Sequence, residues 1–349
     1  MSQPLIQETP AGLYCERGDF YIDPWQRVSK AVITHAHADH ARPGSKSYLT
    51  SREGRNVLRS RLGPSPVIET LRYGEPTLIN GVHLSLHPAG HVLGSAQVRV
   101  EYGGEVWVIS GDYKVEPDVT CSAFEPVPCH TFITESTFGL PVYRWRPQSE
   151  IFDDINRWWI QCRDADRAAV LLAYSLGKAQ RLIAGVDRNI GPIFCHPTVE
   201  ELNREYRSTG IDLPPTLLPS QAPARKAWGG TLIVAPPGVA NSQWMSKFGD
   251  ASFAMASGWM LTRGTRRWQA VDRGFPLSDH ADWPGLLWAI EATKAEQILV
   301  THGHTAPMVR YLKEQGKSAR VLVTRFSDSG EAKDENENEN EEAEVRPPK

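Results

Sequence analysis

The stretch Ala31-Val32-Ile33-Thr34-His35-Ala36-His37-Ala38-Asp39-His40 joins a short apolar run to three histidines and an aspartate. The apolar run predicts a strand, and the polar residues follow at its end, where loop side chains can converge on one point. In extended geometry His35 and His37 project to the same side, while Asp39 and His40 can turn toward a neighbouring position. Imidazole nitrogen and carboxylate oxygen are ligands that suit zinc, manganese or iron. The stretch therefore predicts a metal site at the end of a strand.

Four ligands are too few for two metal ions, so further ligands would have to come from elsewhere in the chain. Three later residues each stand just after an apolar strand or beside a glycine: His91, Asp112 and His302. Taken singly, each is also explained as an ordinary loop or core residue. Their common position at strand ends favours all three together as additional ligands.

Hydrophobic patterning predicts an α/β fold with a discontinuous first domain. Short apolar runs between Gly, Pro and Asp turns predict strands over 30–34, 66–69, 82–86, 97–102 and 105–109. Predicted helices (150–163, 177–187, 199–207) then alternate with strands (168–174, 191–195, 231–235, 252–256), as in a parallel sheet covered by helices. Helix 283–293, strand 297–301, helix 306–315 and strand 319–324 follow. We expect one domain over 1–140 and 257–330, and an inserted domain over 141–256.

Composition indicates an ordinary globular body followed by an unusual tail. Of 349 residues, 40% are hydrophobic and 23% charged, with a net charge of −3. Residues 331–349 carry eight acids and three bases and predict a disordered acidic tail. Five cysteines without a C-x-x-C pair argue against a disulfide framework or a thiolate zinc site. With no secretion signal and no apolar run near roughly 18 residues, we expect a cytoplasmic protein that does not enter a membrane.

The order of the motifs carries a family resemblance. H-A-H-A-D-H (35–40), A-G-H (89–91), S-G-D (110–112) and T-H-G (301–303) resemble the successive motifs of the metallo-β-lactamase fold. T-E-S-T-F (134–138), S-L-G-K-A-Q (175–180), L-S-D-H-A-D (277–282) and V-T-H-G-H (300–304) resemble the β-CASP nucleases. Together with A-S-G-W-M (256–260), the pattern over about 15–326 is most similar to bacterial DNA ligase-associated exonucleases. The resemblance implies a metallo-β-lactamase αββα sandwich with an inserted β-CASP parallel α/β domain.

The resemblance also implies two divalent metal ions, Zn²⁺ or Mn²⁺, and assigns their ligands. Asp112 would bridge the two ions, one completed by His35, His37 and His91, the other by Asp39, His40 and His302. Asp23, in Tyr21-Ile22-Asp23-Pro24, matches the first acidic motif and would orient a histidine ligand. An Asp-Pro turn is the alternative explanation for Asp23.

Phosphodiester hydrolysis needs a nucleophile, stabilisation of the charge that grows on the phosphate, and a proton for the leaving oxygen. Two metal ions supply the nucleophile and the charge stabilisation. Asp39, as a metal ligand, is therefore counted among the catalytic residues. By the resemblance, His280 is the candidate general acid, and Glu135 holds its ring through a hydrogen bond. Spacing alone does not connect these two residues, and without the resemblance His280 would be taken for an exposed loop histidine.

Basic side chains supply the predicted substrate contacts. A helix over 51–62 would place Arg52, Arg55 and Arg59 in one basic stripe. Lys178 and Ser257, beside glycine loops, are further candidate phosphate contacts.

A second basic cluster consists of Arg263, Arg266 and Arg267, beside Trp259 and Trp268. Basic residues interleaved with aromatics suit a single nucleic-acid strand, through phosphate contacts and base stacking. A solvated arginine face explains either cluster equally well.

The choice between DNA and RNA rests on two conflicting signals. His302 at the last motif is typical of RNA-processing β-CASP members, whereas the longer resemblance to the ligase-associated branch favours DNA. We expect a dinuclear-metal DNA exonuclease acting at DNA ends, in repair beside an ATP-dependent DNA ligase. The alternatives are an RNA-processing nuclease, a small-molecule metallo-hydrolase, and a nucleic-acid-binding protein with a structural metal. The inserted domain argues against a compact substrate, and the thiolate-free, open ligand set argues against a structural site.

Overall fold

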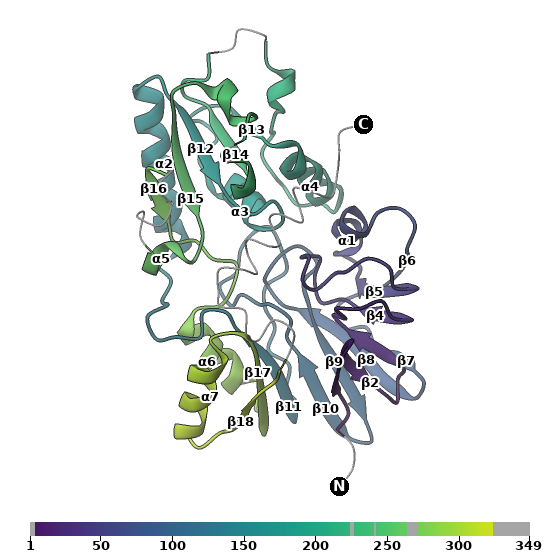
Figure 1. Ribbon diagram of the computed structural model, residues 1–349. Coiled ribbons are helices and arrows are strands. Elements are labelled where there is room, and N and C mark those ends of the chain that lie inside the picture. The colour runs from purple at the N-terminus through teal and green to yellow at the C-terminus, as the bar shows by residue number, and fades with distance from the viewer. Residues whose placement is uncertain (1–3, 224–226, 241, 264–270, 324–349) are drawn as a thin grey trace. The chain divides into compact units, whose positions relative to one another are not determined.

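The computed structural model describes residues 4–223, 227–240, 242–263 and 271–323. The chain forms two compact units. The sandwich unit ends at Arg144 and resumes at His280, and the inserted unit runs from Trp145 to Asp279. Both contain strands and helices (Figure 1), so the predicted α/β class is confirmed. The predicted acidic tail over 331–349 lies outside the described residues.

In the described part of the sandwich unit, the strands form two sheets. The first follows chain order: β1 (Gln7–Thr9), β2 (Gly12–Cys15), β3 (Phe20–Ile22), β4 (Lys30–Val32), β5 (Ser47–Ser51) and β6 (Val67–Leu71). The second has the order β18 (Ser318–Val321), β17 (Gln297–Gly303), β11 (Thr131–Ser136), β10 (Glu105–Ile109), β9 (Ala96–Tyr102), β8 (Val82–Pro88) and β7 (Thr77–Ile79). Each sheet mixes parallel and antiparallel pairs; β10, for example, pairs antiparallel with β9 and parallel with β11.

Strand β10 shows why the unit is layered. Successive side chains of a strand point to opposite faces of its sheet. Trp107 and Ile109 accordingly join the apolar cluster between the two sheets, which also contains Phe20 of β3. Val106 and Val108 point the other way and join the cluster beneath helices α6 (Trp283–Ala292) and α7 (Thr305–Glu314). These two helices therefore cover the outer face of the second sheet, and α1 (Arg55–Leu62) lies beside β6 in the first.

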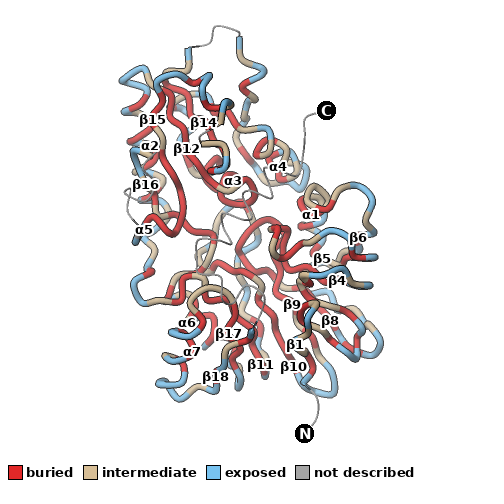
Figure 2. Tube along the Cα trace, in the orientation of Figure 1, coloured by how far each residue is buried: buried red, intermediate tan, exposed pale blue. Residues whose placement is uncertain are grey.

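The sheet of the inserted unit is parallel throughout its described strands. Its order is β13 (Ile193–Cys195), β14 (Leu232–Ala235), β12 (Ala168–Leu172), β15 (Ala251–Ala256) and β16 (Arg273–Phe275). Strand β12 reads A-A-V-L-L and is buried at every position, as expected for a strand covered on both faces. Figure 2 shows the buried residues along these strands and the exposed ones in the turns.

Helices pack on both faces of this sheet. The unit contains α2 (Gln148–Asp164), α3 (Lys178–Gly185), α4 (Pro197–Ser208), α5 (Met260–Arg263) and short 3₁₀ turns at Pro219–Gln221, Pro237–Val239 and Met245–Phe248. Trp159 of α2 and Leu182 of α3 pack with Leu171 on one face. Phe248 packs with Val170 on the other.

Two boundaries differ from the sequence-based expectation. The helix predicted over 51–62 begins only at Arg55, because Ser51 ends β5 and its hydroxyl donates to the Gly94 carbonyl at 2.6 Å. Arg52 therefore precedes the helix. The predicted domain boundary at residue 257 falls between β15 and β16, which are neighbours in one sheet. The chain returns to the sandwich unit at His280 instead.

Among the described residues, none of the helices is both long enough and apolar enough to cross a membrane.

We predict that Gly94→Ala destabilises the protein far more than Gly103→Ala. Both glycines have positive φ, 77° and 60°, so both substitutions carry similar backbone strain. A Cβ on Gly94 would lie 2.0 Å from the Gly54 Cα, whereas a Cβ on Gly103 meets nothing within 4 Å. Urea unfolding should show a loss of about 3 kcal/mol or more for Gly94→Ala and about 1 kcal/mol for Gly103→Ala. Equal losses would contradict the close backbone packing at Gly54.

Candidate metal centre

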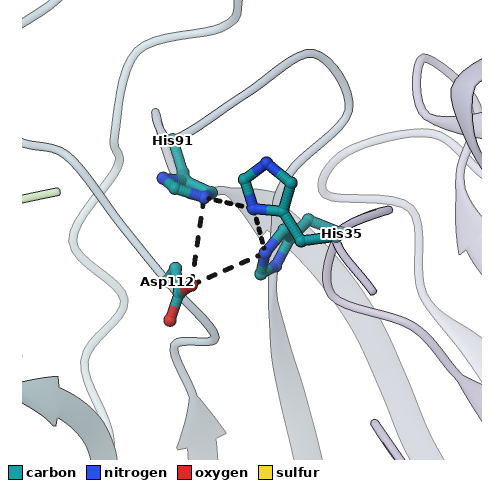
Figure 3. A group of neighbouring side chains, drawn as sticks. His35, His91 and Asp112 are labelled. Atoms are coloured by element: carbon teal, nitrogen blue, oxygen red, sulfur yellow. Dashed lines mark hydrogen bonds and ion pairs between the residues drawn. The ribbon is translucent and has the colours of Figure 1, made fainter. Parts of the chain in front are cut away.

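The predicted ligands come from the ends of several strands of the sandwich unit. His35 and the residues up to His40 follow β4, His91 follows β8, Asp112 follows β10, and His302 lies at the end of strand β17. Side chains far apart in the sequence can converge there because the strand ends meet at one edge of the sandwich. In Figure 3 the side chains of His35, His91 and Asp112 point toward one another.

One group of ligand atoms is compact enough to hold a single ion. His37 Nδ1 lies 3.0 Å from His35 Nε2 and 3.1 Å from His91 Nε2, and Asp112 Oδ2 lies 3.6 Å from His35 Nε2. The four donor atoms all lie within 4.8 Å of one another. Three imidazole nitrogens and one carboxylate are a donor set that suits zinc or manganese. These residues therefore fit a divalent metal.

Asp39 and His40 form a second group of donor atoms with His35, and Asp112 adjoins it. His40 Nε2 lies 3.3 Å from Asp39 Oδ2 and 3.5 Å from Asp112 Oδ2. His40 Nε2 and Asp39 Oδ1 are buried polar atoms without a hydrogen-bond partner, which is costly unless a cation satisfies them. The ring centroids of His302 and His40 lie 5.3 Å apart, and both residues line one pocket with Asp39. Asp112 thus belongs to the first group and lies against the second, as a bridging ligand would.

The charges of the site favour a bound cation. Burial lowers the pKa of His35, and the positive charges of His40 and His91 lower it further, so this ring is a neutral donor. Burial opposes ionisation of Asp112, but the charge and hydrogen bond of His40, together with the charges of His280 and His35, outweigh it and hold the pKa of that carboxyl well below its usual range. Likewise, Asp39, Asp112 and Asp23 together raise the pKa of His40 well above its usual range against the effect of burial. Three carboxylates thus surround one imidazole.

Asp23 fixes the orientation of His40. Its Oδ2 lies 2.7 Å from His40 Nδ1, so the opposite nitrogen, Nε2, faces Asp39 and Asp112. Asp23 is itself held by Thr34, whose backbone N–H donates to Oδ1 at 2.8 Å and whose hydroxyl donates to Oδ2 at 2.5 Å. Thr34 was not among the predicted site residues, although its hydroxyl directly before the first histidine of the motif is a signal for such a role. The arrangement is the one expected of a carboxylate behind a ligating histidine.

His280 and Glu135 lie together, 145 positions apart in the chain. His280 Nδ1 is 3.0 Å from both Glu135 carboxylate oxygens, and the His280 ring is 4.6 Å from that of His91. Glu135 lies in β11, all of whose residues are buried, so no alternating pattern marked this strand in the sequence. The N–H of Tyr113 donates to Glu135 Oε1 at 2.7 Å. The segment after Asp112 thereby fixes the carboxylate, a role the sequence did not reveal.

The predicted substrate contacts differ in their surroundings. Arg52 and Arg55 are exposed around the start of α1, whereas Arg59 donates to the carbonyls of Gly63, Pro64 and Pro66. Lys178 and Ser257 are buried in the inserted unit. Arg266, Arg267 and Trp268 lie outside the described residues, as does the side chain of Arg263.

Comparisons with known proteins find similarity to proteins that are named as a DNA ligase and as endoribonucleases. No family model matches the chain. It is 30% identical over 313 residues to a protein named "Probable DNA ligase" from Opitutus terrae, covering 89% of this chain and 30% of that protein. It is 27% identical over 173 residues to "Endoribonuclease ysh-1" from Neurospora crassa, covering 47% of this chain and 19% of that protein. It is 30% identical over 143 residues to "Endoribonuclease YSH1" from Yarrowia lipolytica, covering 40% of this chain and 17% of that protein.

The chain therefore spans less than a third of the length of these curated relatives. Among solved structures, it resembles a protein of unknown function from Enterococcus faecalis V583, with a TM-score of 0.59 and 12% identity. The match covers 85% of this chain and 80% of that one. At this identity the likeness concerns the fold alone.

We predict that Asp23→Asn weakens metal binding by about 10- to 100-fold, because His40 loses the carboxylate that orients it. The matched control is Asp19→Asn: both aspartates have positive φ, 43° and 52°, but Asp19 bonds to the exposed Tyr14 hydroxyl. Calorimetric titration of the metal-free variants with Zn²⁺ or Mn²⁺ measures the two metal affinities. Equal affinities for the two variants would contradict the proposed role of Asp23.

Proposed function

We propose that this protein is a dinuclear-metal-dependent nuclease of the metallo-β-lactamase/β-CASP group, with the β-CASP domain as the inserted unit. The observation that carries the proposal is the His280–Glu135 pair beside a cluster of metal-ligand residues in one unit. A metal centre alone would serve many hydrolases, but a separate, oriented imidazole beside it supplies the proton that a poor alkoxide leaving group needs. Similarity to proteins named endoribonucleases supports the same class.

Two divalent ions fit the ligand groups described above. His35, His37 and His91 would hold one, Asp39, His40 and His302 the other, and Asp112 would bridge them. When bound, such ions polarise the phosphate and lower the pKa of a water molecule enough for it to attack at neutral pH. The donor set accepts both Zn²⁺ and Mn²⁺.

The protein's own groups account for the remaining steps. Glu135 accepts from His280 Nδ1, which stabilises a protonated ring and aims Nε2 away from the carboxylate. That nitrogen would donate its proton to the leaving oxygen of the substrate. Arg52 and Arg55, which are exposed, are proposed phosphate contacts, and Arg266 is a third.

We further propose that the substrate is DNA, degraded from its ends during repair in association with an ATP-dependent DNA ligase. The support is the match to a protein named as a DNA ligase, which extends over 89% of this chain. Because that relative is much longer, a segment like this chain is joined there to other sequence in one polypeptide. A cytoplasmic location accompanies this proposal.

RNA is the second candidate substrate. His302 at the last motif favours it, as do the relatives named endoribonucleases, which match 40% and 47% of the chain. A small-molecule metallo-hydrolase is a weaker alternative, since the inserted unit would have no evident use.

We predict that metal-free protein restored with Zn²⁺ or Mn²⁺ shortens single-stranded DNA stepwise. Oligonucleotides of one sequence, made as DNA and as RNA and labelled at either end, give both the substrate and the polarity. Asp39→Ala serves as the control for contaminating nucleases. Cleavage of the RNA without cleavage of the DNA would replace the repair proposal by RNA processing. If neither oligonucleotide is cleaved, the proposal that the protein is a nuclease is wrong.

We predict that His280→Ala lowers kcat on nucleic acid by roughly 10²- to 10⁴-fold, the usual contribution of a general acid. Metal content should stay unchanged, because His280 is assigned to neither ion. His83→Ala, which removes an exposed histidine of β8, is the control. Full activity of His280→Ala would exclude it as the proton donor.

A further inference from the structure

Asp279, the residue directly before His280, is held by two cations of the inserted unit. Its side chain and those of Lys178 and Arg181 are each about 4% exposed. Asp279 Oδ2 lies 3.6 Å from Lys178 Nζ, and Oδ1 lies 3.3 Å from Arg181 Nη1. Arg181 Nη1 also donates to the carbonyl of Ser278. The last two residues before His280 are thus tied to the start of helix α3.

Helix α3 is itself firmly placed within the inserted unit. Arg181 donates through Nε and Nη2 to Gln148 Oε1 of α2, at 3.1 and 2.9 Å. Gln180 accepts from the Gly177 N–H at 2.8 Å and donates to Asn203 Oδ1 of α4 at 2.9 Å. The anchor of Asp279 is therefore fixed to two further helices.

On the other side of His280 the chain is held by the sandwich unit. The Ala281 N–H donates to the Tyr113 carbonyl at 2.7 Å, and Asp282 caps α6 by accepting from the Gly285 N–H at 2.9 Å. The boundary between the two units falls between residues 279 and 280. The backbone of the candidate general acid thus stands between an anchor in each unit.

We propose that Lys178 and Arg181 are positioning residues, which set the orientation of His280 through Asp279. This inference rests on the proposed function. A buried ion pair is a poor source of net stability, since desolvation offsets most of the attraction, but it fixes geometry. Lys178 then acts through Asp279, in place of the phosphate contact that the sequence suggested.

The test compares two substrates that differ in their need for a general acid. Cleavage of a DNA phosphodiester requires protonation of the leaving alkoxide, whereas a p-nitrophenyl phosphodiester releases a weakly basic phenolate that leaves without it. His280→Ala should lose activity on DNA and keep it on the nitrophenyl ester. We expect Asp279→Asn to behave likewise, with kcat on DNA reduced roughly 10-fold, a part of the general-acid effect, and the ester rate within about 2-fold.

Lys178→Met is a second variant that should fold readily, because Arg181 still neutralises Asp279. It should lower kcat on DNA a few-fold without changing KM. Asp154→Asn is the control for Asp279→Asn, since it removes another ion-paired carboxylate of the inserted unit, and Lys247→Met is the control for Lys178→Met. Both controls should retain activity on both substrates.

Three results would overturn the inference. Equal losses of activity on both substrates would indicate a general structural effect. Unchanged activity of Asp279→Asn on DNA would show that Asp279 does not orient His280. A raised KM for Lys178→Met would indicate that Lys178 contacts the phosphate of the substrate. If the unaltered protein cleaves neither nucleic acid, or if His280→Ala is fully active, the proposed function itself fails. If His280→Ala is selectively impaired and Asp279→Asn is not, only this inference fails.

Discussion

Buried ionisable groups are concentrated at one edge of the sandwich unit, and the elements around them are arranged to hold these groups together. Three imidazole nitrogens and a carboxylate oxygen lie within 4.8 Å of one another, and Asp39 and His40 adjoin them. Such groups are expensive to hold together away from water unless each is satisfied by a neighbour or by a bound cation. The surrounding elements hold them in place: strands that end at the same edge, and Asp23 and Thr34 behind His40.

Rigid strands suit this task better than loops alone. Strand β10 uses Trp107 and Ile109 for the core between the sheets and Val108 for the core beneath the helices, so its end cannot shift without disturbing both. Asp112 follows this strand closely. The segment beyond it continues the support, because Tyr113 holds Glu135 through its N–H and Ala281 through its carbonyl. The candidate ligand Asp112 and the His280–Glu135 pair are therefore held by a common piece of backbone.

The inserted unit adds a second layer of organisation. Its parallel sheet is buried on both faces and supplies a stable support for helix α3. Lys178 and Arg181 at the start of this helix hold Asp279, which is covalently joined to His280.

Local sequence patterns were enough to indicate the α/β class, most of the element positions and the residues of the candidate metal centre, because hydrophobic periodicity and a dense run of His and Asp are local signals. The sequence left two roles open for Asp23, and it did not indicate the role of Thr34, the strand β11 or the contacts of Tyr113. These depend on hydrogen bonds between distant segments, and a strand buried on both faces has no alternating pattern. The same reason explains Lys178: beside a glycine loop it suggested a phosphate contact, and only the tertiary structure places Asp279 next to its ammonium group. Local composition names the groups that chemistry needs, whereas their partners are decided by packing.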